Sequence, residues 1–175
     1  MRRIRRLAVL ALVLLPMAAA VADAPPTGSF AFSFDTDLPG TPEEMYDALT
    51  GDIAGWWDHS MSGDPAALVI EARPGGRFLE VFDASGDGVV HATVTHAHRG
   101  RMLRMVGPLG LAGHAVTMVT TYELAPRDGG GSRLTVTVHA SGEVHPGWDA
   151  VVQRTWEHFI VDRFVPWVTA GKHRG

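Results

Sequence analysis

The feature that most constrains this chain is a long run of alternating apolar and polar residues between positions 67 and 143. A period of two places successive side chains on opposite faces of a strand. Turn sequences interrupt the run, among them RPGG at 73–76 and PRDGGGS at 126–132. Short connections of this kind favour antiparallel pairing of neighbours in a meander. The strands predicted from this pattern lie at 67–72, 77–83, 89–99, 101–107, 115–124 and 133–143.

One face of the predicted sheet is more apolar than the other, so another element must cover it. Leu134, Val136 and Val138, for example, alternate with polar residues. The cover is predicted at residues 148–168, where apolar residues recur at helical spacing. Pro166 is expected to kink or end that helix.

The start of the domain predicts one more strand and two short helices. SFAFSF at 29–34 alternates, and a turn is expected at 35–40. TPEEMYDALT at 41–50 predicts a helix whose N-cap is Thr41, with a capping box completed by Glu44. GDIAGWW at 51–57 is interpreted as a second, shorter helical piece.

Together these elements predict an α+β domain over residues 29–170, preceded by a flexible leader at 25–28. A curved antiparallel sheet of about seven strands would wrap around the long C-terminal helix. Such an arrangement leaves a gap between the sheet and the helix.

Residues 1–24 have the three-part layout of a secretory signal peptide. Arginines fill MRRIRR, an apolar run follows at 7–22, and cleavage is expected after Ala22 or Ala24. A retained anchor is the alternative, disfavoured because the run contains Pro16 and is shorter than the about 20 residues that a membrane span needs. The expected location is therefore periplasmic or secreted, without stable membrane insertion after cleavage.

Composition excludes several classes of function. The chain has no cysteine, which rules out disulfides, thiolate catalysis and cysteine metal sites. Its formal net charge is −4 and its one lysine is Lys172, so nucleic acid is not an expected partner. No strand, glycine loop and helix pattern suited to phosphates is present, and no cofactor is expected.

Four phrases resemble the SRPBCC superfamily, which has the helix-grip fold of START domains and the birch-pollen allergen. They are TPEEMYDALTGDIAGWW (41–57), IEARPGGRFLEVF (70–82), GRMLRMVGPLG (100–110) and TWEHFIVDRFVPWV (155–168). The chain is most similar to the branch named after the activator of heat-shock-protein-90 ATPase. The resemblance implies a largely apolar cavity between sheet and helix, in a family of lipid, hormone and polyketide binders and cyclases. Most members of that branch are cytoplasmic, so a chaperone-linked role does not follow for an exported chain.

The expected function is that of an exported binder or carrier of a lipid or other small apolar molecule. The predicted cavity lining is Trp57, Phe78, Met105, Leu109, Met118, Tyr122, Trp156 and Ile160. A cyclase- or hydrolase-like enzyme and a ligand-free structural or interaction domain are the alternatives. The oligomeric state stays open.

The stretch GDIAGWWDHS poses a choice between packing and chemistry. Trp56 and Trp57 are expected to act as a wall or plug of the core. Asp58 and His59 have no nucleophile or second partner nearby in the sequence, so they are interpreted as surface turn residues.

Glu80 is the main candidate acid–base residue for the enzyme alternative, with Tyr122 or a histidine as the other candidates. In FLEVF it shares a face with Phe78 and Phe82, and burial there would raise its pKa. The alternative, which is favoured, is a solvent-facing carboxylate or one paired with Arg77 or Arg104.

His96 and His98 are weak candidates for a metal site. They lie two apart on one strand and so share a face. Glu71, Glu80 or His114 could supply a third ligand. Because polar residues are expected at a strand end anyway, no metal is predicted.

Overall fold

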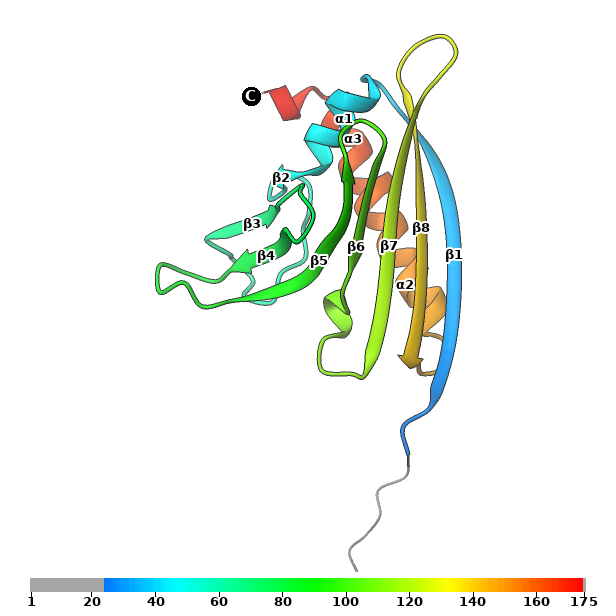
Figure 1. Cartoon of the computed structure of the whole chain (residues 1–175). Coiled ribbons are helices and arrows are strands. Elements are labelled where there is room, and N and C mark those ends of the chain that lie inside the picture. Colours follow the sequence, from blue (N-terminus) through cyan, green and yellow to red (C-terminus); the bar gives the residue numbers. More distant parts are fainter. Residues whose placement is uncertain (1–23, 175) are drawn as a thin grey trace, which may run out of the picture.

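Eight strands form one antiparallel sheet in the computed structural model, which describes residues 24–174 (Figure 1). The strands are β1 (Thr27–Leu38), β2 (Gly51–Asp52), β3 (Ala67–Ile70), β4 (Arg77–Val81), β5 (Gly88–His98), β6 (Met102–Val106), β7 (Val116–Pro126) and β8 (Ser132–Glu143). Their spatial order is β1-β8-β7-β6-β5-β4-β3-β2. The strands from β2 to β8 follow sequence order, as a meander requires, and β1 closes the far edge beside β8.

The first strand is longer than its sequence predicts. β1 continues through Asp35 and Asp37, where a turn was expected. Both aspartates point outward, because the alternation that starts at the phenylalanines carries on. Asp35 accepts a hydrogen bond from Thr135 at 2.7 Å, and Asp37 accepts one from Arg133 at 3.2 Å.

The helix α1 (Pro42–Leu49) forms as predicted, but the second short helix does not. Thr41 caps α1 by accepting a hydrogen bond from the Glu44 amide at 3.2 Å. The Glu44 carboxylate binds Arg174 at 2.7 Å instead of completing a capping box. Gly51 and Asp52 pair with β3 as the short strand β2, and a turn follows.

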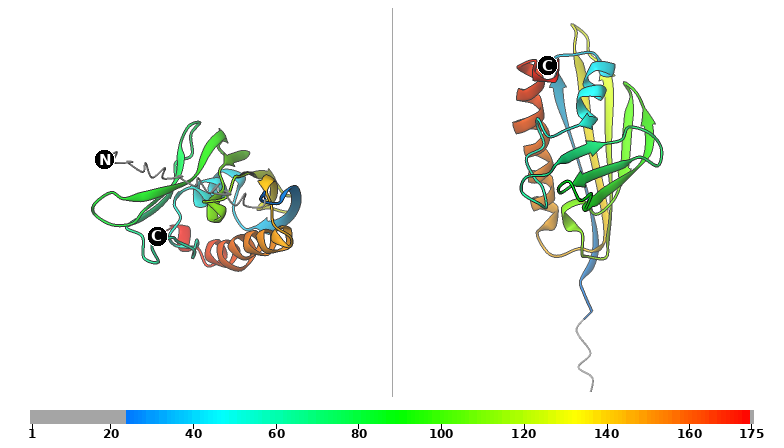
Figure 2. Two further views of the ribbon diagram at one scale, coloured as in Figure 1. Left: turned by 90° about the horizontal axis from the view of Figure 1, so that it is seen from below. Right: turned by 90° about the vertical axis from the view of Figure 1, so that its left-hand side faces the viewer.

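One long helical segment runs along one face of the sheet (Figure 2). It consists of α2 (Trp148–Glu157), a π-helical segment η2 (His158–Phe164) and α3 (Val165–Thr169). Pro166 does not end it. The Val165 amide donates a hydrogen bond to the carbonyl of Ile160, five residues earlier, which is the π-helical pattern. This wider turn comes directly before Pro166, which has no backbone N–H to donate. Short 3₁₀ turns lie at Leu109–Leu111 (η1) and Lys172–Arg174 (η3).

The sheet bends because β5 carries two irregularities. Its register shifts against β4 between Phe78 and Leu79, and against β6 between Val94 and His96. Each bulge adds an unpaired residue and increases the local twist. The strands β3 and β4 consequently turn away from the flat part of the sheet (Figure 1).

The predicted α+β class is confirmed, with eight strands in place of about seven among the described residues. The expected signal peptide lies outside them, apart from Ala24, and β1 begins within the expected leader, at Thr27. None of the described helices has both the length and the apolar character needed to cross a membrane.

Candidate functional site

A β-bulge turns His91 into the interior. Leu79 pairs with Val90 and Phe78 pairs with Ala92, so His91 has no partner on β4. His91 and Ala92 are both buried although they are neighbours. A bulge re-aims a side chain in this way, and bulges are common beside functional sites.

The inward-turned His91 forms a hydrogen bond with the carboxylate of Glu80, a residue that is fully buried, with 0% exposure. His91 donates from Nε2 to Oε2 at 2.8 Å. The Met61 amide donates at 2.9 and 3.0 Å to the two oxygens, and the Ser62 amide and hydroxyl donate at 2.9 and 3.0 Å. Glu80 therefore fastens the loop between β2 and β3 to the sheet and fixes the tautomer of His91.

These hydrogen bonds reverse the pKa shift expected from the sequence. Burial works to raise the pKa of Glu80, but the donors Met61, Ser62 and His91 together lower it below the ordinary value. The favoured sequence interpretation, exposure or an arginine partner, is also wrong, because Glu80 is buried and pairs with His91. An ionised, fully bonded carboxylate orients its neighbours and is not poised to donate a proton.

An apolar cavity of about 270 Å³ lies between α2, η1 and the sheet. Four of the predicted lining residues border it: Trp57, Leu109, Met118 and Trp156. The residues that sequence reasoning missed are His59, Ser60, Met61, His91, Gly110, Leu111, Val151, Val152, Thr155 and Phe159. The volume is near the lower end of the usual range for ligand sites, about 300–1,000 Å³.

The other four predicted lining residues lie in the core and do not border the cavity. Phe78, Met105, Tyr122 and Ile160 are all at most 3% exposed. Burial raises the pKa of Tyr122 well above its ordinary value, so its phenol stays protonated. Alternation along the strands, and helical spacing for Ile160, identified these residues as inward-facing but did not show which part of the interior is filled.

The two adjacent tryptophans have different roles. Trp56 is 1% exposed and packs edge-on against Phe164, with ring centroids 5.0 Å apart. Trp57 stacks on Phe159 at 3.7 Å and borders the cavity. We call the region around Trp56, Ile160 and Phe164 the packed end of the helix–sheet interface, and the region around Trp57 and Trp156 the cavity end.

The loop from Gly107 to His114 forms a wall of the cavity through η1. Leu109 is buried and has a φ of 50°, the one positive value among the described residues other than glycine. A non-glycine residue in this region stores strain of order 1–3 kcal/mol, and such strain gathers at ligand sites. Gly107 is needed at the start of the loop, because a Cβ there would lie 2.3 Å from the His91 carbonyl oxygen.

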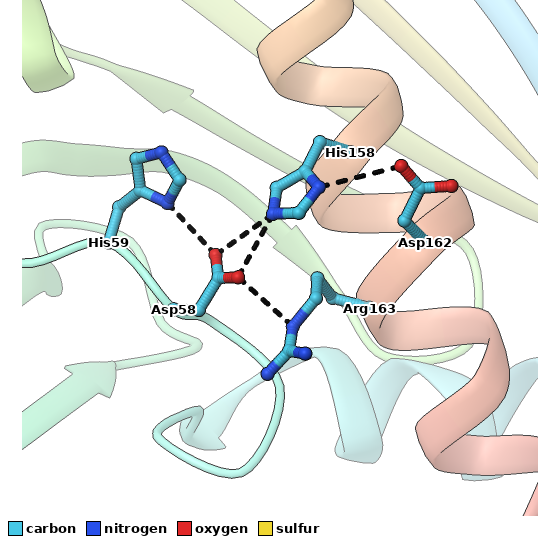
Figure 3. A network of polar contacts seen from close by, with 5 residues as sticks. All are labelled: Asp58, His59, His158, Asp162 and Arg163. Atoms are coloured by element: carbon cyan, nitrogen blue, oxygen red, sulfur yellow. Dashed lines mark hydrogen bonds and ion pairs between the residues drawn. The ribbon is translucent and has the colours of Figure 1, made fainter.

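Asp58 has partners on the C-terminal helix that lie far from it in the sequence, and His59 is bonded to Asp58 (Figure 3). Asp58 accepts hydrogen bonds from His59 at 2.9 Å and from His158 at 3.0 Å, and it pairs with Arg163 at 3.2 Å. Burial opposes ionisation, but these contacts lower the pKa of Asp58 overall. His158 lies 100 positions away, so local sequence reasoning could not find it.

His96 and His98 lie elsewhere, in an open hollow of about 960 Å³ near α1 and the β5–β6 turn. Both are exposed, and charged residues such as Arg101 and Glu123 also line the hollow. Neither histidine belongs to a metal-compatible cluster among the described residues. This hollow is the larger of the two, but its polar, open lining suits water better than an apolar molecule.

No family model matches this chain, and no curated protein matches it. Solved structures do. CV1439 from Chromobacterium violaceum is 21% identical with a TM-score of 0.55, over 79% of this chain and 96% of that one. An uncharacterized protein from Rhizobium leguminosarum is 14% identical with a TM-score of 0.58, over 84% and 99%.

DynU16, a protein in the dynemicin biosynthetic locus, is 20% identical with a TM-score of 0.53. The match covers 81% of this chain and 48% of DynU16. At these identities the similarity defines the fold: a curved antiparallel sheet with a long C-terminal helix.

Proposed function

We propose that this protein binds a small, mainly apolar molecule in the cavity at the cavity end. The observation that carries the proposal is an apolar space of about 270 Å³ bordered by the buried histidine His91. An apolar lining with a few placed polar groups is the usual composition of a ligand site. Burial of apolar ligand surface would supply the affinity, at about 25 cal/mol per Å².

The polar groups at the cavity indicate what kind of ligand fits. His91 commits Nε2 to Glu80, which leaves Nδ1 as an acceptor in the neutral ring. We therefore expect a ligand with an apolar body and one polar group.

A titration with the apolar fluorophore N-phenyl-1-naphthylamine tests this proposal. Trp156→Ala should weaken binding about tenfold, because it removes a wall of the cavity. Trp167→Ala is the matched control, since Trp167 packs near Phe164 at the packed end. Equal affinities for the two variants and the wild type would place the fluorophore outside this cavity, and no binding at all would favour a ligand-free structural or interaction domain.

A second candidate function is a cyclase- or hydrolase-like enzyme, favoured by one observation. Glu80 orients His91 at the edge of the cavity, as a carboxylate orients a catalytic base. Hydrolysis of p-nitrophenyl esters by wild type and by His91→Gln tests it. A rate that falls to background in the variant supports the enzyme, and equal rates remove it.

We also propose membership of the SRPBCC superfamily and export to the periplasm or medium. The family proposal is supported by the four resembling phrases and the shared fold, and the occurrence of DynU16 in a biosynthetic locus is consistent with a small-molecule role.

The export proposal rests on the sequence of residues 1–24. Mass spectrometry of the protein from its own host tests both the cleavage site and a co-purifying ligand.

A further inference from the structure

Two clusters of histidine and carboxylate side chains converge within metal-binding distance in the described part of the chain. One is Asp58 with His59 and His158, and the other is His114 with Glu143 and His145. The two clusters differ in whether an arginine already pairs with the carboxylate. Arg163 already places a positive charge 3.2 Å from Asp58, which opposes a cation there. Among the described residues, the ion pairs of Glu143 are with its two histidines alone.

Strand pairing assembles the second cluster from three segments. Glu143 ends β8, His114 precedes β7, and His145 lies in the connection to α2. The Glu143 amide donates to the Ala115 carbonyl at 2.9 Å, continuing the β7–β8 ladder. Residues 29 positions apart are thereby held together by backbone bonds, independently of any ion.

The ligand atoms already point at one another. His114 Nδ1 lies 2.9 Å and His145 Nε2 lies 3.2 Å from the same oxygen, Oε1 of Glu143. Bonds of about 2.0–2.2 Å to a tetrahedral zinc ion place ligand atoms about 3.3 Å apart. The three ligand atoms lie within 4.8 Å of one another, and an ion that takes the place of the two hydrogen bonds needs them to shift to this spacing.

The surroundings hold these side chains in place. The Ala115 amide donates to the other Glu143 oxygen at 3.2 Å. The Trp148 ring packs against both imidazoles, with centroids 4.9 Å from His114 and 4.7 Å from His145. Supporting contacts of this kind orient metal ligands and tune their affinity.

We propose that His114, Glu143 and His145 bind one divalent transition-metal ion, with Zn²⁺ as the best match. Two imidazoles and one carboxylate suit zinc, and three protein ligands leave a fourth position for water. The histidine side chains are 40% and 39% exposed, so an ion can enter from solvent. This site is separate from the proposed ligand cavity and does not depend on it.

Calorimetric titration of untagged, chelator-treated protein with Zn²⁺ tests the proposal. We expect one equivalent bound, with affinity reduced at least about tenfold in Glu143→Gln, which keeps an acceptor oxygen. Asp58→Asn, at the other cluster, is the matched control and should bind zinc like the wild type. Absence of binding, unchanged affinity in Glu143→Gln, or loss of binding in Asp58→Asn would overturn the assignment.

A second measurement uses Trp148 as a reporter. Cu²⁺ at this site should quench the Trp148 fluorescence, because the ring lies beside both imidazoles. The quenched fraction should disappear in Trp148→Phe and in His114→Gln, a change at an exposed side chain that leaves the core intact. Quenching that persists in His114→Gln would place the ion elsewhere and contradict the proposal.

Discussion

The two ends of the C-terminal helix meet the sheet in different ways. At the packed end, Ile160 and Phe164 are 0% exposed, and Trp56 fills the space against the sheet. At the cavity end, Trp156 is almost as buried, but the packing leaves about 270 Å³ open. Buried side chains therefore occur at both ends of the helix, and the ends differ in how completely these side chains fill the space between helix and sheet.

This comparison shows that burial alone does not define a binding site. A filled interior supports stability, because close packing maximises contacts and excludes voids. An unfilled apolar space lowers stability, and here it lies beside a strained Leu109 and an inward-turned His91, which supports the proposed ligand site. Mutations at the two ends of the helix should therefore differ in their effects on stability and on binding.

The largest expected effect is that of Phe164→Ala at the packed end. It should reduce the free energy of unfolding by about 3–5 kcal/mol, because it opens a new void in a filled core. Phe159→Ala, in the same π-helical segment η2, should cost less, since Phe159 already borders open space. Denaturant unfolding of both variants measures the difference, and a larger loss in Phe159→Ala would contradict the division into two ends.

Glu80→Gln should cost about 2–4 kcal/mol, because it disrupts a buried charged group that accepts from Met61, Ser62 and His91. We also expect the loop carrying Trp57 to loosen and binding of the fluorophore to weaken. Urea unfolding and hydrogen exchange of the Met61 and Ser62 amides provide the measurements. Unchanged exchange at these amides would show that Glu80 does not anchor the loop.

The same carboxylate predicts a pH dependence. The pKa of Glu80 is lowered in the folded state, so its contribution is present above the unfolded value of about 4.3 and is lost as pH falls through the folded pKa. The stability gap between wild type and Glu80→Gln should therefore narrow below about pH 4.3. A gap that stays constant from pH 7 down to acid unfolding would mean that Glu80 is not ionised when folded.

The smallest expected effect is that of Arg163→Gln, in the exposed network of Figure 3. The Arg163 side chain is 45% exposed and that of Asp58 is 31% exposed, so their ion pair should contribute less than about 1 kcal/mol. Thermal unfolding with and without added salt measures it. A loss comparable with that of Glu80→Gln would show that the helix is held by this network and not by the core.

The sequence predicted the sheet and the helix because both have strict periods. Alternation between Ala67 and Glu143 and helical spacing after Trp148 are properties of single segments, and the structure keeps them. The β5 bulges could not be predicted in this way. They depend on pairing with β4 and β6, and one of them turns His91 inward.

The cavity was predicted only in part, for a related reason. Alternation identifies inward-facing residues, and Met105 and Met118 both face inward. Only Met118 borders the cavity, because the gap depends on how α2 and η1 lie over the sheet. The contact between Asp58 and His158, and that between His114 and Glu143, likewise require the folded chain.

Indole N–H resonances in a ¹⁵N NMR spectrum test the central claim most directly, since the five tryptophans report on both ends of the helix. On addition of N-phenyl-1-naphthylamine, the signals of Trp57 and Trp156 should move, and those of Trp56 and Trp167 should stay in place. Shifts at Trp56 and Trp167 with none at Trp57 and Trp156, or no shifts at saturating probe, would contradict a ligand site at the cavity end.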